Sequence, residues 1–120
     1  MSDQFKIIAV RFFRTASGTE PVREWLKELS RDDCRIIGED IKTVEFGWPI
    51  GMPLCRSISG YKDLWEVRSQ LTGSRIARVI FYTKNGEMIL LHGFIKKTQQ
   101  IPQSDLDLAD KRRREHEKNG

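Results

Sequence analysis

This chain of 120 residues contains little cysteine, little proline and no long hydrophobic run. Its two cysteines, Cys34 and Cys55, form no CxxC pair and have no cluster of histidines beside them, so the sequence predicts no zinc site. A single disulfide between them stays open as an alternative to two reduced thiols. No apolar run approaches the length of a membrane-spanning helix, and residues 1–10 lack the basic start and apolar stretch of a signal peptide. We expect a soluble cytoplasmic protein that does not bind a membrane.

Several catalytic motifs are also absent from the sequence. It contains no glycine-rich phosphate loop, no GxSxG, no HExxH and no conspicuous pair of carboxylates. We therefore expect neither a metal nor a cofactor. The enzymatic option that remains is metal-free cleavage of RNA, in which the 2′-hydroxyl attacks the adjacent phosphate and cations stabilise the charge that develops there.

The composition is that of one globular domain over residues 1–120, with 38% hydrophobic and 32% charged residues. The net charge is +4, and the positive excess is unevenly distributed. A run of four cations, KRRR, occupies residues 111–114, whereas Glu39, Asp40 and Glu45 make the middle of the chain more acidic. This balance favours a nucleic acid or an acidic protein as the partner.

The first half of the sequence predicts one strand and a helical hairpin. β-Branched and aromatic residues indicate a strand over residues 5–13. Thr19 is expected to cap the first helix, and Ser30 to cap a second helix over residues 31–46. The apolar positions of the first helix follow the spacing of one helical face: Val22, Trp25, Leu26 and Leu29. Residues 47–60 hold prolines and glycines that stop regular structure, so we expect an irregular segment there.

The second half predicts a three-stranded antiparallel meander and a last helix. The strands are expected over residues 63–71, 75–83 and 87–95. The Asn85-Gly86 pair between the last two strands is a strong hairpin signal, because both residues tolerate a positive φ. The last helix is expected over residues 104–117, docked by its first turns only. With the first strand joining the meander and the helical hairpin covering one face, the order β-αα-βββ-α predicts a two-layer α+β domain.

Cationic side chains recur along this meander. Trp65 and Val67 are the expected core positions of its first strand, which leaves Glu66 and Arg68 exposed on the other face. Arg78 lies in the middle of the central strand. If Arg68 and Arg78 project from the same face, their planar guanidiniums can bind phosphate oxygens together. A cross-strand ion pair between Arg78 and Glu66 explains the same residues equally well.

Other residues of the second half are candidates for proton transfer or for RNA contact. His92 is a candidate proton carrier because histidine gains and loses a proton near neutral pH, and a half-buried histidine bonded within the sheet is the alternative. Tyr82 or a lysine are further candidates for the proton donor. The cations expected to contact RNA are Arg75, Lys96, Lys111, Arg112 and Arg113. For the run of four cations, the alternative is a solvated helix face.

Four segments of the sequence form one pattern. They are LWEVR at residues 64–68, RIARVIFY at residues 75–82, LLHGFIKKTQ at residues 90–99 with a proline three positions later, and DLDLADKRRRE at residues 105–115. Through these segments, and through its order of strands and helices, the chain resembles the RelE/HigB-type toxins of type II toxin–antitoxin systems. The similarity is greatest to the phage-associated HigB-like branch.

The resemblance implies a ribosome-dependent endoribonuclease that cuts mRNA in the decoding site and inhibits translation. It also implies neutralisation by a helix-turn-helix antitoxin of the HigA type, which binds operator DNA as part of the toxin–antitoxin complex. Arg68, Arg78 and Lys97 fall on basic positions that bind and polarise the RNA phosphate in that family, and Lys96 competes with Lys97 for the last of them. RelE itself has a tyrosine in its terminal helix, but this chain has no tyrosine after Tyr82.

Two other functions remain compatible with the sequence. The same superfamily contains ParE-like toxins that inhibit DNA gyrase without cutting RNA, and the missing tyrosine fits such a protein. The basic tail also fits a small, non-enzymatic module that binds RNA or DNA.

Overall fold

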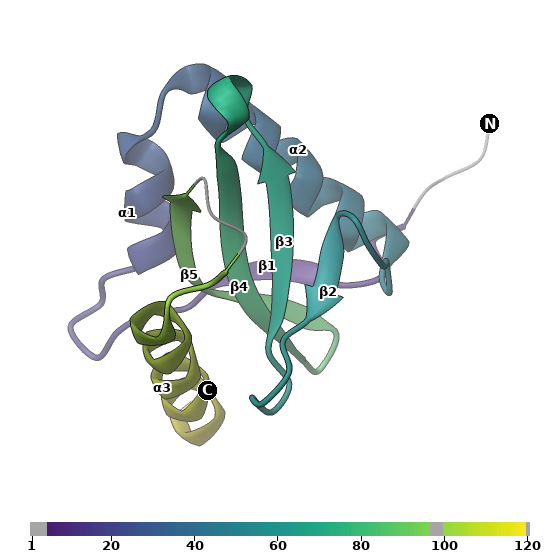
Figure 1. Cartoon of the computed structure of the whole chain (residues 1–120). Helices are drawn as coiled ribbons and strands as arrows, with labels where there is room; N and C mark the ends of the chain where they lie inside the picture. Colours follow the sequence, from purple (N-terminus) through teal and green to yellow (C-terminus); the bar gives the residue numbers. More distant parts are fainter. Residues whose placement is uncertain (1–4, 97–99, 120) are drawn as a thin grey trace.

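A five-stranded mixed sheet forms the centre of the protein (Figure 1). The computed structural model describes residues 5–96 and 100–119. The strands lie in the order β1-β5-β4-β3-β2, with β1 parallel to β5 and the other neighbours antiparallel. Their bounds are β1 Ala9–Phe12, β2 Cys55–Ser57, β3 Trp65–Gln70, β4 Ile76–Lys84 and β5 Glu87–Lys96. This arrangement confirms the predicted α+β fold and the addition of the first strand to the meander.

The helical hairpin begins and ends close to the predicted positions. Helix α1 covers Pro21–Glu28 and α2 covers Arg31–Gly47. The Ser30 hydroxyl accepts a hydrogen bond from the backbone N–H of Asp33 at 3.1 Å, as expected of a cap. The prediction for Thr19 was wrong, because Glu20 is the first flanking residue of α1 and its side chain makes no capping bond.

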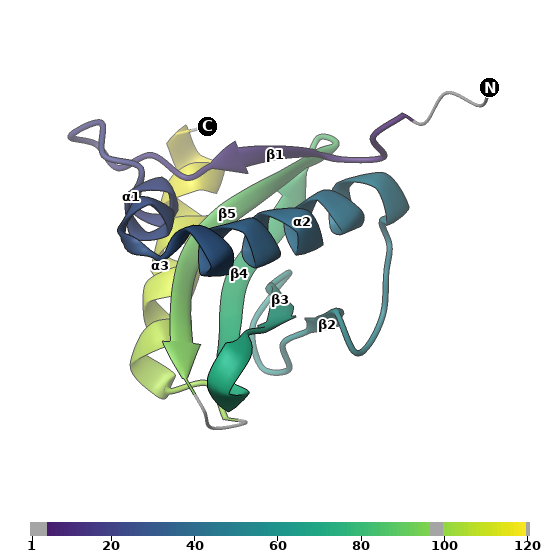
Figure 2. The same ribbon diagram turned by 90° about the horizontal axis from the view of Figure 1, so that it is seen from above.

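Apolar side chains line both faces of the sheet. On one face, Val67, Val79 and Phe81 pack with Ile37 and other residues of α1 and α2. On the other face, a second cluster packs against α3, which covers Gln103–Asn119: Phe13, Leu64, Ile80, Tyr82, Ile89, Leu91, Phe94 and Ala109. Seen from above, α1 and α2 lie on one side of the sheet and α3 on the other (Figure 2).

Two predictions about the elements are corrected by the structure. Residues 47–60 are not irregular throughout, because the short strand β2 forms there and pairs with residues 65–67 of β3. Helix α3 docks along most of its length, not by its first turns alone, since Ala109 and Arg113 are buried and His116 contacts Tyr82. Polar contacts therefore hold a helix that has few apolar residues to bury.

Turn chemistry explains why the meander closes as predicted. Asn85 and Gly86 both have positive φ, of 52° and 76°, in the β4–β5 turn.

The strand predicted over residues 5–13 is shorter in the structure, where β1 has only four residues. The helices of the described residues include none that is long and apolar enough to span a bilayer.

Candidate functional site

Cations from four strands project from the sheet face opposite α1 and α2. Residues that are directly paired in antiparallel strands share a face, so the register arranges this face in three rows. The rows are Arg56–Glu66–Ile80–His92, Arg68–Arg78–Phe94 and Gln70–Ile76–Lys96. We call the ionisable members Arg56, Glu66, Arg68, Arg78, His92 and Lys96 the cationic face. The sequence left open whether Arg68 and Arg78 share a face, and their direct pairing shows that they do.

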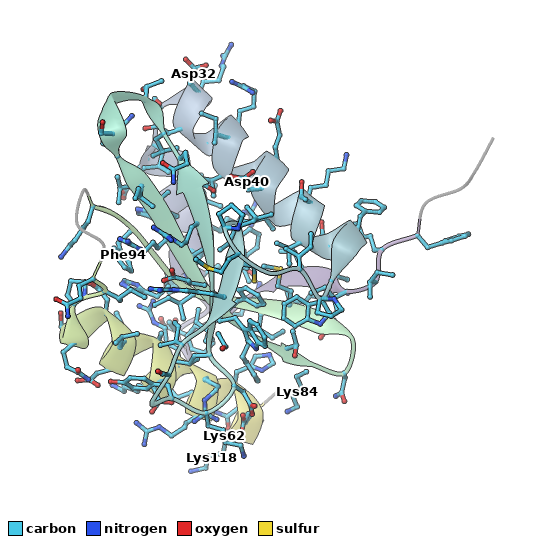
Figure 3. The ribbon with its side chains drawn as sticks, turned by 45° about the vertical axis from the view of Figure 1, so that its right-hand side comes forward. Asp32, Asp40, Lys62, Lys84, Phe94 and Lys118 are labelled. Carbon is cyan, nitrogen blue, oxygen red and sulfur yellow. The ribbon has the colours of Figure 1, made fainter. Side chains whose placement is uncertain are left out.

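A β-bulge places His92 on the cationic face. The register between β4 and β5 shifts between Ile80 and Phe81, where Ile80 pairs with His92 but Phe81 pairs with Leu90. The extra residue, Leu91, reverses the alternation of every later residue of β5. Without it His92 would lie on the side of α1 and α2. Figure 3 shows the result for Phe94, which lies near the N-terminal turns of α3.

The Glu66 carboxylate is the centre of this face. Its Oε1 atom lies 2.9 Å from Nε of Arg56 and 3.6 Å from Nε of Arg68, and its Oε2 atom lies 3.8 Å from Nε of Arg78. The side chains of Glu66 and Arg78 have no exposed surface, whereas Arg68 is 12% exposed and Arg56 40% exposed. The expectation that Glu66 is exposed was wrong, because the face that carries it is also covered.

Burial has a direct electrostatic effect on Arg78. It lowers the pKa of the guanidinium, the Glu66 carboxylate opposes that change, and the neighbouring charges of Arg68 and Arg56 add to it. An arginine nevertheless keeps its charge at any physiological pH. Of the two sequence-based interpretations, the structure thus contains the ion pair with Glu66, and the guanidinium lies beneath the surface rather than on it.

His92 contacts a carboxylate from the last helix. Its Nε2 atom lies 2.6 Å from Oδ1 of Asp105, and Nζ of Lys96 lies 4.0 Å from Oδ2 of the same residue. The rings of His92 and Phe94 stack with their centroids 5.6 Å apart. His92 also borders a cavity of about 210 Å³, and Arg112 is another of its lining residues.

The other predicted RNA-contacting residues are placed differently. Arg75 holds the β3–β4 turn to α2 through two hydrogen bonds to Asp33, of 2.8 and 3.0 Å. Arg112 donates to the carbonyl of Leu91 at 2.8 Å, and Arg113 is buried in contacts with other residues of α3. Lys111 is exposed on α3. The structure therefore brings Arg68, Arg78, His92 and Lys96 together on one face. The four cations just described lie elsewhere: Arg75, Lys111, Arg112 and Arg113. Lys97 lies outside the described residues.

Tyrosines lie away from the centre of this face. The Tyr82 hydroxyl contacts Nδ1 of His116 near the far end of α3, and burial raises the pKa of Tyr82 to about 12. The Tyr61 hydroxyl donates to Asp107 at 3.0 Å. Tyr82 thus holds α3 to β4, and Tyr61 holds α3 to the loop between β2 and β3.

Three residues of the site were not predicted as members of it. Arg56 lies in the short β2, and its only signal was a run of six residues, 54–59, free of proline and glycine. Glu66 was recognised only as an ion-pair partner. Asp105 had no local signal, because its role depends on where α3 docks. Within the ranges 5–96 and 100–119, histidines, cysteines and carboxylates form no group of three that could hold a metal ion.

Comparison with known proteins gives one family. The family model described as phage-derived protein Gp49-like (DUF891) matches residues 24–114, which include every residue of the cationic face. A search of the curated proteins finds no match.

Proposed function

The chain belongs to the Gp49-like family of RelE-like toxins, and from this premise we propose that it is the toxin of a type II toxin–antitoxin system that cleaves mRNA on the ribosome. The observation that carries the proposal is the cationic face, where three arginines surround one carboxylate beside a histidine–aspartate pair. Its proposed partners are mRNA, the ribosome and a helix-turn-helix antitoxin of the HigA type, which would bring the complex to operator DNA.

Two cations of this face that keep some exposed surface are the proposed phosphate ligands. Arg68 is partly exposed and Lys96 is 44% exposed, so both can meet an oxygen of the RNA backbone. From the strand and residue spacings, the Cα atoms of Arg68 and His92 lie about 12 Å apart, close enough for both side chains to reach one phosphodiester. Guanidinium donors would stabilise the additional negative charge as the 2′-oxygen attacks phosphorus.

Arg78 has a supporting role in this proposal. Since it is fully buried, it adds positive charge from beneath the face and holds the carboxylate that faces Arg68. Arg78 is therefore a positioning residue for Arg68. The same arrangement explains why Arg56 belongs to the site, because it contacts Oε1 of Glu66, the oxygen that also lies nearest to Arg68.

The proposal is tested by inducing the protein in a bacterial host that lacks any antitoxin and mapping the 5′ ends of transcripts soon afterwards. New ends inside translated reading frames, absent when translation is blocked, are the expected result. Arg68→Ala should remove them. Arg35→Ala is the matched control, because Arg35 lies on α2 behind the sheet in an exposed pair with Glu39 and should cleave like the wild type.

A ParE-like inhibitor of DNA gyrase is the second candidate, favoured by one observation. The burial of Arg78 removes one of the predicted cations from the surface that RNA would meet. Growth arrest accompanied by DNA damage signalling, with transcripts intact, would establish this candidate in place of the nuclease. A folded protein that causes no arrest would instead indicate a nucleic-acid-binding module.

A further inference from the structure

We propose that Asp105 is a positioning residue that fixes the tautomer and the orientation of His92, so that this histidine serves as the base that takes the proton of the 2′-hydroxyl. This inference rests on the proposed nuclease function and deepens it. It starts from one contact, the 2.6 Å distance between Nε2 of His92 and Oδ1 of Asp105.

The contact assigns the proton on the imidazole ring. An ionised carboxylate only accepts hydrogen bonds, so Nε2 must carry the hydrogen that lies between the two groups. In the neutral ring, Nδ1 then has the lone pair that accepts a proton. Both side chains are largely buried, at 16% and 19% exposure, and Phe94 stacks on the ring of His92, so its orientation is fixed from two directions.

The residues around His92 suit a proton acceptor that works beside the RNA phosphate. The nearby cations are Lys96, which contacts the same aspartate, and Arg112, which borders the same cavity while bonded to the carbonyl of Leu91. The lining residues from α1 are uncharged: Pro21, Val22 and Trp25. On the sheet, Ile80 separates His92 from Glu66 in its row. Asp105 is therefore the carboxylate in contact with the ring.

The proposed step conserves every atom and proton. The 2′-oxygen forms a bond to phosphorus as its proton moves to Nδ1 of His92, and the bond from phosphorus to the 5′-oxygen breaks. The leaving 5′-oxygen takes a proton from water, and the hydroxide that remains takes the proton from the imidazolium, which returns His92 to its neutral form. The products are a 2′,3′-cyclic phosphate and a 5′-hydroxyl. Asp105 stabilises the imidazolium that forms and does not itself take the proton, as in other histidine–carboxylate pairs.

Asp107 provides a control for the structural role of α3. Two residues further along the same helix, its Oδ1 atom accepts hydrogen bonds from Tyr61 and from Gln103, each at 3.0 Å. Asp107 thus also holds α3 to the loop between β2 and β3, which contains Tyr61, but it does not contact His92. Changing either aspartate to asparagine removes one carboxylate from the first turns of α3, and only one of the changes reaches the histidine.

The first measurement is spectroscopic. The chain has only two histidines, so a ¹⁵N–¹H correlation spectrum of the imidazole rings resolves His92 from His116. In the wild type, neutral His92 should carry its hydrogen on Nε2. Asp105→Asn should give a mixture of tautomers, and Asp107→Asn should keep the wild-type signal. An unchanged His92 signal in Asp105→Asn overturns the inference.

The second measurement is single-turnover cleavage of mRNA on purified, programmed ribosomes. His92→Gln should slow cleavage by about 10²- to 10⁴-fold, the usual contribution of a general base. Asp105→Asn should lose at least tenfold, and the double variant should be no slower than His92→Gln alone, because the two residues act as one unit. Asp107→Asn should stay within about twofold of the wild type.

The outcomes distinguish a failure of the proposed role of Asp105 from a failure of the proposed nuclease function. If the wild type cleaves and Asp105→Asn cleaves equally fast, the role of Asp105 is refuted while the nuclease stands. If the losses of the two single variants multiply in the double variant, Asp105 acts elsewhere and the inference fails. If the wild type leaves mRNA intact, the proposed nuclease function is refuted, and the role proposed for Asp105 is refuted as well.

Discussion

Replacing the buried Glu66 by glutamine should destabilise the protein strongly. The substitution keeps the shape of the side chain and removes the negative charge that Arg56, Arg68 and Arg78 share. Arg56 is 40% exposed and water can screen its charge, but Arg68 is mostly and Arg78 entirely buried. Removing one partner of a buried ion pair typically costs about 3–5 kcal/mol, because the remaining charge stays buried.

The expected change in melting temperature follows from the size of the chain. Unfolding entropy of about 2.1 cal/mol/K per residue gives roughly 0.25 kcal/mol/K for the 120 residues. A loss of about 3–5 kcal/mol then lowers Tm by roughly 12–20 °C. Circular dichroism at 222 nm, recorded during a thermal scan near pH 7.5, measures this directly.

Glu39→Gln is the matched control for this substitution. Glu39 forms an exposed pair with Arg35 on α2, at 3.3 Å, and such surface pairs contribute about 0.3–0.5 kcal/mol. Its Tm should therefore change by about 2 °C or less. A Glu66→Gln protein that melts within about 3 °C of the wild type would refute the view that this carboxylate neutralises buried arginines.

Three further predictions test other parts of the structure. Gly93→Ala should lower Tm by roughly 4–12 °C, because a Cβ there would lie 2.4 Å from the rigid ring of Trp25, whereas Gly38→Ala, with open space around it on α2, should be neutral or stabilising. Burial raises the pKa of Tyr82 to about 12, so absorbance at 295 nm should show its phenol ionising about two pH units above an ordinary tyrosine. Because the folded state keeps this proton longer than the unfolded chain, stability should fall as pH rises from about 10 to about 12, and Tyr82→Phe should reduce that fall. Burial likewise raises the pKa of Cys55 to about 11, so its thiol should resist maleimide at pH 8 until the protein unfolds.

Local patterns were sufficient to predict most of the fold. Periodicity located both helices of the hairpin, and the Asn85-Gly86 pair located the β4–β5 turn, because these signals depend only on neighbouring residues. The short β2 was missed for the opposite reason. Its three residues have no pattern of their own and form a strand only because β3 offers an edge to pair with.

The candidate site could be predicted only in part. Alternation groups Arg68 with Glu66 along β3 and Arg78 with Ile80 along β4, but only the register between the two strands shows that both arginines share one face. The same alternation along β5 fails at the bulge, so it could not show that His92 and Lys96 join them. The burial of Glu66 was missed because an alternating strand was assumed to have one solvated face, whereas this sheet has apolar clusters on both.

Cleavage of mRNA in a reconstituted translation reaction is the most direct test of the proposed nuclease activity. The purified protein is added to ribosomes stalled at a defined codon, and the ends of the RNA products are identified. We expect products with a 2′,3′-cyclic phosphate and a 5′-hydroxyl at the decoding site, formed only when ribosomes are present. Arg68→Ala should form them about 10²- to 10³-fold more slowly, and Arg35→Ala at the wild-type rate. Intact mRNA after prolonged incubation with the folded wild-type protein would show that the protein is not a ribosome-dependent nuclease.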